Sequence, residues 1–154
     1  SKDMVPLIDV IKFVLKKEEK IYDEIWLLYP CSPLTNKNDL ISASKKFSNN
    51  KGKFPLISVR EFDAPIEWSL KRKKDLYIPN NKKKLSIDSK KLEKNYYESA
   101  SFLIFKPEHL KSNSNFQKYF GYLLPKRRAI DIDDLDDWNI AESLYKNLMN
   151  DTLQ

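Results

Sequence analysis

The sequence predicts an α/β fold in which helices and strands alternate along one domain. Two observations favour this class. Between residues 6 and 59, segments of helical spacing alternate with short apolar runs in the order helix, strand, helix, strand. The links between these segments are short, which is typical of parallel strands joined by crossover helices. The length of 154 residues suits a single domain with its own core.

The first helix and the first strand are expected within residues 6–28. Pro6 suits the first turn of a helix, where its missing N–H is harmless. The apolar residues that then recur at helical spacing are Leu7, Ile8, Ile11, Val14 and Leu15. The following run, Ile25-Trp26-Leu27-Leu28, is apolar throughout and predicts a strand that is buried on both faces.

A loop and a second helix–strand pair come next. Pro30 and Pro33 lack the backbone donor that a strand ladder needs, so the segment 29–34 is a loop. Residues 34–47 have helical spacing, and residues 54–59 predict another strand. In open α/β sheets ligands lie beyond the carboxyl ends of the strands, so we expect this loop at the functional edge.

The middle of the chain, residues 62–95, keeps neither the helical nor the strand period. It combines charge clusters with short aromatic stretches, and we expect an arm that leaves the sheet and meets a second subunit. The strand pattern resumes at residues 96–105 and 120–124, and a further extended segment is expected at 128–131.

The last helix has the clearest pattern. Asp133 or Asp134 can cap it, and Asp136 and Asp137 place negative charge in its first turn, where the helix dipole favours it. Its apolar stripe consists of Leu135, Trp138, Ala141, Leu144, Tyr145 and Leu148.

The bulk composition narrows the partners without choosing one. A net charge of +6 suits anionic ligands in general. The lysine runs are not interleaved with aromatic residues as in a nucleic-acid-binding module, so no nucleic acid partner is expected. The sequence contains neither a signal peptide nor an apolar run of about 18 residues, so we expect no membrane association and a cytoplasmic location. Cys31 is the single cysteine, which excludes an intrachain disulfide.

The strongest local motif is Ala129-Ile130-Asp131-Ile132-Asp133. Residues i and i+2 of a strand share a face, so Asp131 and Asp133 are expected to present two carboxylates side by side. Neighbouring carboxylates repel each other unless a cation lies between them, and Mg²⁺ takes oxygen ligands that it shares with phosphates. The pair therefore indicates a Mg²⁺–nucleotide site. The alternative is that Asp133 caps the helix and Asp131 is exposed.

These residues and others resemble the acylneuraminate cytidylyltransferase family. The stretch from Asp131 to Trp138, with Ala141-Glu142 after it, is similar to the closing motif of that family. The segment 27–34 resembles the family's sugar-side loop, with Pro-x-Ser-Pro-Leu after an apolar strand. The segments 58–62, 65–66 and 96–105 resemble the next strand, its arm and the strand after the arm. The matches follow the family's order along nearly the whole chain.

The resemblance implies a three-layer Rossmann-like sandwich of the nucleotide-diphospho-sugar transferase type, with an extended dimerisation arm over residues 62–95. It implies an enzyme that joins CTP to an acidic nine-carbon sugar and releases pyrophosphate, with Mg²⁺ as cofactor and a homodimer as the assembly. Asp131 and Asp133 are then the catalytic and metal-binding residues, and Tyr29, Ser32 and Glu98 contact the sugar. Tyr29 and Pro65-Ile66 are more similar to the pseudaminic-acid branch than to the sialic-acid branch.

The chain departs from the family pattern in two places. Nothing in it matches the glycine-rich loop that holds the CTP phosphates, so residues 1–154 are expected to be a partial cytidylyltransferase domain, the C-terminal two-thirds, inactive alone. Asp88 stands where the family has an arginine that meets the acidic sugar, so this role is unfilled unless Lys90 or Lys91 takes it. Tyr97-Glu98-Ser99-Ala100 replaces a His-Asp-x-Gly motif. The alternative function is a non-catalytic dimerisation or regulatory module that retains the scaffold.

Overall fold

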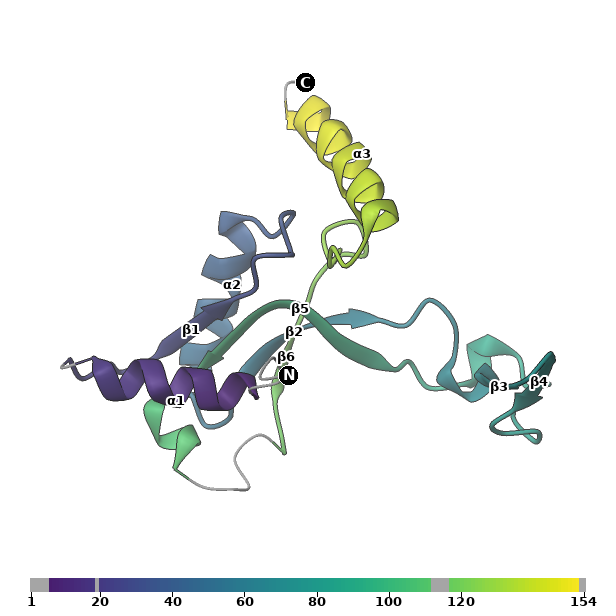
Figure 1. The fold of residues 1–154 in the computed structure, drawn as a ribbon, viewed down its shortest axis with the longest axis horizontal. Coiled ribbons are helices and arrows are strands. Elements are labelled where there is room, and N and C mark those ends of the chain that lie inside the picture. The colour runs from purple at the N-terminus through teal and green to yellow at the C-terminus, as the bar shows by residue number, and fades with distance from the viewer. Residues whose placement is uncertain (1–5, 19, 112–116, 153–154) are drawn as a thin grey trace.

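The computed structural model describes residues 6–18, 20–111 and 117–152, with side chains described as far as residue 148. In chain order the elements are α1 (Leu7–Lys17), β1 (Ile25–Leu28), α2 (Lys37–Asn49), β2 (Leu56–Glu61), η1 (Ile66–Trp68), β3 (Leu70–Lys73), β4 (Leu76–Pro79), η2 (Ser89–Lys91), β5 (Tyr96–Phe105), η3 (Pro107–Leu110), β6 (Phe120–Leu123) and α3 (Leu135–Thr152). Figure 1 shows their arrangement.

The main sheet is mixed. Its four strands lie in the order β1-β5-β2-β6. β5 is antiparallel to both of its neighbours, whereas β2 and β6 are parallel. β1, β2 and β6 therefore run in one direction, which agrees with the expected β1–α2–β2 crossover, and β5 runs in reverse between β1 and β2. The predicted α/β class is confirmed, with a sheet less uniform than the sequence indicated.

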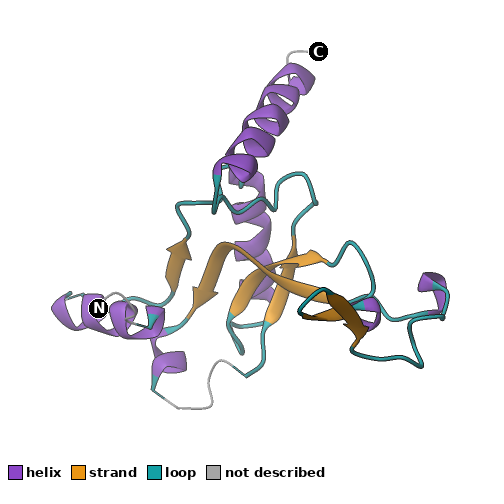
Figure 2. Ribbon diagram, turned by 45° about the vertical axis from the view of Figure 1, so that its right-hand side comes forward, coloured by secondary structure: helices purple, strands orange, loops and turns teal. Residues whose placement is uncertain are grey.

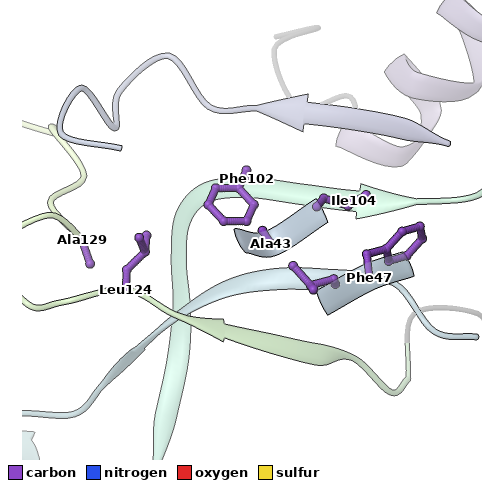
Figure 3. Packing of buried hydrophobic residues seen from close by; sticks show 7 residues of the cluster. Ala43, Phe47, Phe102, Ile104, Leu124 and Ala129 are labelled. Atoms are coloured by element: carbon purple, nitrogen blue, oxygen red, sulfur yellow. The ribbon is translucent and has the colours of Figure 1, made fainter. Parts of the chain in front are cut away.

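Helices pack against both faces of this sheet. On one face, α2 contributes to the main core, whose buried members are Ala43, Phe47, Leu56, Phe102, Ile104, Leu124 and Ala129. Figure 3 shows Phe47 and Phe102 among these side chains. On the other face, Ile11 of α1 packs with Leu103 and Phe105 of β5. Full burial of each large apolar side chain stabilises the fold by about 1.5–3 kcal/mol.

α2 begins later than the helical spacing alone suggests, because a capping box fixes its start. The side chain of Asn36 accepts a hydrogen bond from the backbone of Asp39 at 3.0 Å, and the carboxylate of Asp39 accepts one from the backbone of Asn36 at 3.1 Å. This reciprocal pairing satisfies two of the orphan donors at the helix start. The segment 34–36 is thereby assigned to the loop that follows β1.

The segment expected to be an arm does leave the sheet. β3 and β4 form a separate antiparallel hairpin, which lies far from the main sheet at the right of Figure 1. All of β3 is exposed, and Leu76 and Tyr77 of β4 are 69% and 62% exposed. The hairpin thus presents apolar side chains away from the core.

α3 also extends away from the sheet, as Figure 2 shows at the top of the molecule. Half of its predicted apolar stripe is exposed: Leu135 is 79% exposed, Trp138 and Tyr145 are also exposed, Leu144 and Leu148 are half-buried, and Ala141 is buried. The spacing predicted the helix correctly, and Trp138, Ala141 and Tyr145 line a pocket together with Pro33 and Leu34 of the loop after β1. Within the described residues, no helix is long and apolar enough to cross a membrane.

Candidate functional site

The carboxyl ends of β1, β2 and β6 meet at one edge of the sheet. Because β5 runs in reverse, its first half lies at this same edge, where Glu98 is opposite Val59 of β2. The backbone N–H of Tyr29, just after β1, donates to the carbonyl of Ser101 at 3.1 Å. The backbone N–H of Ile132 donates to the carbonyl of Cys31 at 2.9 Å. Tyr29, Glu98 and the Asp131 segment are therefore gathered at one edge.

Tyr29 and Glu98 form a direct pair. The hydroxyl of Tyr29 donates to Oε1 of Glu98 at 3.2 Å across 69 positions of sequence. Burial, followed by the negative charge of Glu98 and, more weakly, that of Asp131, raises the pKa of Tyr29 to about 12. Tyr29 is therefore a neutral hydrogen-bond donor at neutral pH. A phenol beside an exposed carboxylate is suited to binding the hydroxyl groups of a sugar.

A bulge in β5 presents Glu98 at this position. The register shifts between Ile57 and Val59 of β2, which pair with Leu103 and Glu98 of β5. The extra residues of β5 are held by the buried hydroxyl of Ser58. That hydroxyl accepts hydrogen bonds from the backbone N–H of Ser101 at 3.2 Å and of Phe102 at 3.0 Å. The bulge thus turns the chain while its backbone donors remain satisfied.

Ala100, inside the bulge, has a φ of +47°. This is the left-handed region, which glycine adopts without the steric penalty of a Cβ atom. Ala100 is also the position at which the resembled motif carries glycine. The positive φ gives a physical reason why glycine would suit this position, which this chain fills with a less suited residue.

Ser32 lies below the surface of the edge. It is 7% exposed, and its hydroxyl is hydrogen-bonded to the hydroxyl of Ser101 at 2.7 Å. A longer contact of 3.4 Å joins it to the hydroxyl of Thr35. In this structure Ser32 fastens the loop after β1 to the β5 bulge, and so holds Tyr29 beside Glu98. Its role toward a sugar stays a prediction.

Asp131 and Asp133 lie in a segment that is not a strand. The expected extended strand at residues 128–131 is absent, and the segment is attached to the loop after β1 by the Ile132–Cys31 hydrogen bond. Among the described residues β6 pairs with β2 over Phe120–Leu123, and a turn at residues 126–128 follows, so the ladder does not continue to Asp131. Side-by-side carboxylates can therefore not be inferred from strand alternation.

Electrostatics nevertheless link the two carboxylates. Burial raises the pKa of Asp131, and the negative charges of Asp133 and then Asp137 raise it further. Asp134 caps α3, since its Oδ1 accepts from the backbone of Asp136 at 2.9 Å and of Asp137 at 3.0 Å. The carboxylate of Asp133 is exposed and does not make the cap. Mutual repulsion of this kind is what a cation would relieve.

The carboxylates at this edge suit a cation that is held partly by the protein and partly by substrate phosphates. Among the described residues, no group of three or more His, Cys, Asp or Glu side chains is placed to hold a metal ion. Mg²⁺ commonly keeps several waters and takes only one or two carboxylates together with substrate phosphates. Asp131 and Asp133 fit that pattern.

Sequence reasoning missed a buried ion pair beneath the site. Arg128 donates to both carboxylate oxygens of Asp39, at 3.0 and 2.7 Å, and the hydroxyl of Tyr122 donates to Asp39 at 3.3 Å. Asp39 is 1% exposed. The pair attaches the turn after β6 to the start of α2. The Asn-x-x-Asp pattern at 36–39 marks the helix start, but no local signal connects it to Arg128.

Comparison with known proteins identifies two similar curated proteins. Both are named pseudaminic acid cytidylyltransferase and come from Campylobacter jejuni subsp. jejuni, serotypes O:23/36 and O:2; they are 32% and 31% identical to this chain over 137 residues. The matches cover 86% of this chain, and the chain spans only 58% of the length of either relative. No protein-family model matches. The two names confirm the family resemblance found in the motifs.

Proposed function

This chain is a relative of the pseudaminic acid cytidylyltransferases, and we propose that it forms the sugar-side and metal-binding part of an enzyme that makes a CMP-linked nonulosonic acid. In this reaction the anomeric hydroxyl of the sugar attacks the α-phosphorus of CTP, and pyrophosphate leaves. The observation that supports the proposal is the convergence of Tyr29, Glu98 and Asp131 at the carboxyl edge of the sheet. Sugar and nucleotide must meet at such an edge.

The residues have separate proposed roles. Tyr29 donates a hydrogen bond and Glu98 accepts hydrogen bonds, so together they orient sugar hydroxyls. Asp131 and Asp133 hold Mg²⁺, which neutralises phosphate charge when bound. Arg128 and Asp39 keep the Asp131 segment on the sheet edge. Pseudaminic acid is the preferred substrate in this proposal because it is the sugar named in both relatives.

The direct test is pyrophosphate release from CTP with Mg²⁺ and either pseudaminic acid or N-acetylneuraminic acid. It should be carried out on the chain alone and on the complete gene product. We expect release from the complete product with pseudaminic acid. Asp131→Asn and Asp133→Asn should reduce it at least about a hundredfold, the scale of removing one charge-stabilising group. Asp136→Asn is the matched control, because Asp136 lies in the first turn of α3 outside the pair.

No release with either sugar from the complete product would reject the activity. Equal losses in all three variants would reject a specific role for Asp131 and Asp133. Retained activity in the Asp131 and Asp133 variants would place the cation elsewhere.

A second candidate function is a non-catalytic dimerisation module. The exposed apolar residues of the β3–β4 hairpin favour it, because Leu76 and Tyr77 are exposed on a hairpin that lies far from the main sheet. This function predicts a dimer in sedimentation equilibrium that is weakened by Leu76→Ser and Tyr77→Ser, and no heat on titration of the complete product with Mg²⁺ and CTP. A heat of binding would exclude a purely non-catalytic role, while a dimer is compatible with both candidates.

A further inference from the structure

A cluster of charged side chains lies where β2 leaves the sheet and the arm begins. Asp63 follows β2, and both of its carboxylate oxygens are engaged. Arg60 donates to Oδ2 through its NH2 group at 2.6 Å, and Lys126 donates to Oδ1 at 2.5 Å. Arg60 and Asp63 come from the β2 end, whereas Lys126 comes from the turn after β6. A single carboxylate is therefore held between two cations from two elements.

Arg60 is much less exposed to solvent than the carboxylate that it holds. The side chain of Arg60 is only 18% exposed, and its NH1 group donates to the carbonyl of Ala129 at 3.4 Å. The side chain of Asp63 is 62% exposed. Arg60 is thus fixed by its surroundings, while the exposed carboxylate can exchange with solvent at little cost. The donors are preorganised, and their present acceptor is replaceable.

Two further observations show that Asp63 does not saturate the cluster. Within the described part of the chain, the buried Nε of Arg60 has no hydrogen-bond partner. A buried donor without an acceptor destabilises a structure, so a nearby acceptor would be favoured. In addition, two positive charges share one negative charge, which leaves the cluster with an excess of one positive charge. Both features favour an additional anionic group.

The cluster borders a cavity of about 570 Å³. It is lined by Asp63 together with Phe62, Pro65, Trp68 and Tyr97, whereas Arg60 and Lys126 are not among its lining residues. The ring centroids of Tyr97 and Phe62 are 4.8 Å apart. The guanidinium carbon of Arg60 lies 5.9 Å from the Tyr97 ring centroid. The volume is in the range of small-molecule sites and the walls are mostly apolar. The one charged side chain among the lining residues is Asp63, which the two cations hold.

We propose that Arg60 and Lys126 form a binding site for the carboxylate group of a small organic acid, and that Asp63 fills this site when no ligand is bound. The planar guanidinium can bind a carboxylate through two parallel hydrogen bonds, which explains the choice of arginine at the fixed position. Applied to the acidic sugar, the inference rests on the proposed function and supplies the cationic contact that Asp88 does not provide.

The test uses the chain itself and observes the Nε–H signal of Arg60 by ¹⁵N NMR. Three probes are compared: N-acetylneuraminic acid, its neutral methyl ester and inorganic phosphate. We expect the free acid to shift the Arg60 signal in a saturable manner, and the ester and phosphate to leave it in place. Asp63→Asn should tighten binding of the acid about fivefold, because the competing internal carboxylate is removed.

Two variants distinguish binding at this cluster from a general effect of positive surface charge. Lys126→Gln should weaken binding of the acid, and the side chain of Lys126 is 56% exposed, so the fold should tolerate the change. Lys94→Gln is the matched control, since Lys94 pairs with Glu61 at 3.1 Å and its side chain is 70% exposed. It should leave binding unchanged.

The proposal is overturned if the acid and the ester shift Arg60 alike, if phosphate competes equally, or if Asp63→Asn leaves the affinity unchanged. In each case the cluster would be a structural bridge or an unselective anion contact. Failure of the enzyme assay is a separate result. A saturable Arg60 shift without pyrophosphate release would retain the carboxylate site and reject the cytidylyltransferase activity.

Discussion

Arg128 binds both carboxylate oxygens of Asp39, at 3.0 Å from Nε to Oδ2 and 2.7 Å from NH2 to Oδ1. The two residues are 89 positions apart, and Asp39 is almost completely buried. The contact connects the start of α2 to the turn from which the Asp131 segment departs.

Arg128→Met should lower the free energy of unfolding by about 3–5 kcal/mol, because it leaves the buried carboxylate of Asp39 without its partner. Asp39→Asn should lower it by less, because the side chain of Arg128 is 20% exposed. Urea denaturation measures the change. Lys146→Ala is the control, since it breaks an exposed helix pair with Glu142 at 3.2 Å and should change stability by no more than about 0.5 kcal/mol. Equal effects in the buried and exposed pairs would contradict the assigned importance of Asp39.

Ala100→Gly should stabilise the protein by up to about 1 kcal/mol. Its φ of +47° disfavours any residue with a Cβ atom, and relief of that penalty should exceed the extra entropy that glycine has in the unfolded chain. Ala100→Val should destabilise, because a β-branched residue fits this region worse. Thermal and urea unfolding of the pair test both signs; a stabilising valine would be inconsistent with the observed backbone conformation.

Ser58→Ala should destabilise the protein by about 1–3 kcal/mol, since it leaves the N–H groups of Ser101 and Phe102 buried without their acceptor. Amide hydrogen exchange should then accelerate at these two residues before other parts of β5. Ser48→Ala, at an exposed position of α2, serves as the control and should change stability by less than about 0.5 kcal/mol. Unchanged exchange at residues 101 and 102 would remove the assigned role of Ser58.

The sequence predicted the elements better than their pairing. The helical spacing of residues 7–15 and the apolar run 25–28 depend on neighbours in the chain, so α1 and β1 could be recognised locally. The insertion of β5 in reverse between β1 and β2 depends on contacts between distant residues, and no local pattern encodes it. Half of the α3 stripe is exposed for the same reason, because spacing determines the face of a helix but not what covers it.

In the candidate site too, local features could be predicted from the sequence, whereas contacts between distant residues could not. Tyr29 and Asp131 could be selected because a loop after a buried strand and an Asp-x-Asp motif are local features. The bulge that sets Glu98 beside Tyr29 depends on the hydroxyl of Ser58, 43 positions from Ser101, and could not be anticipated. The Arg60–Asp63–Lys126 cluster likewise needs two elements that only the folded chain brings together.

Tyr29 should ionise at a pH about two units higher than an ordinary tyrosine. Its pKa is raised from 10.0 to about 12, first by burial and then by the charge of Glu98. The folded state therefore holds this proton more tightly than the unfolded state, so the associated stability is complete below pH 10 and is lost as the pH rises toward about 12. Absorbance at the phenolate band should show a late phase that Tyr29→Phe removes. Glu98→Gln should bring that phase to lower pH without abolishing it, because burial remains the larger cause. If Glu98→Gln left the late phase in place, the hydrogen bond between these side chains would not persist in solution, and the pair could not act together on a sugar.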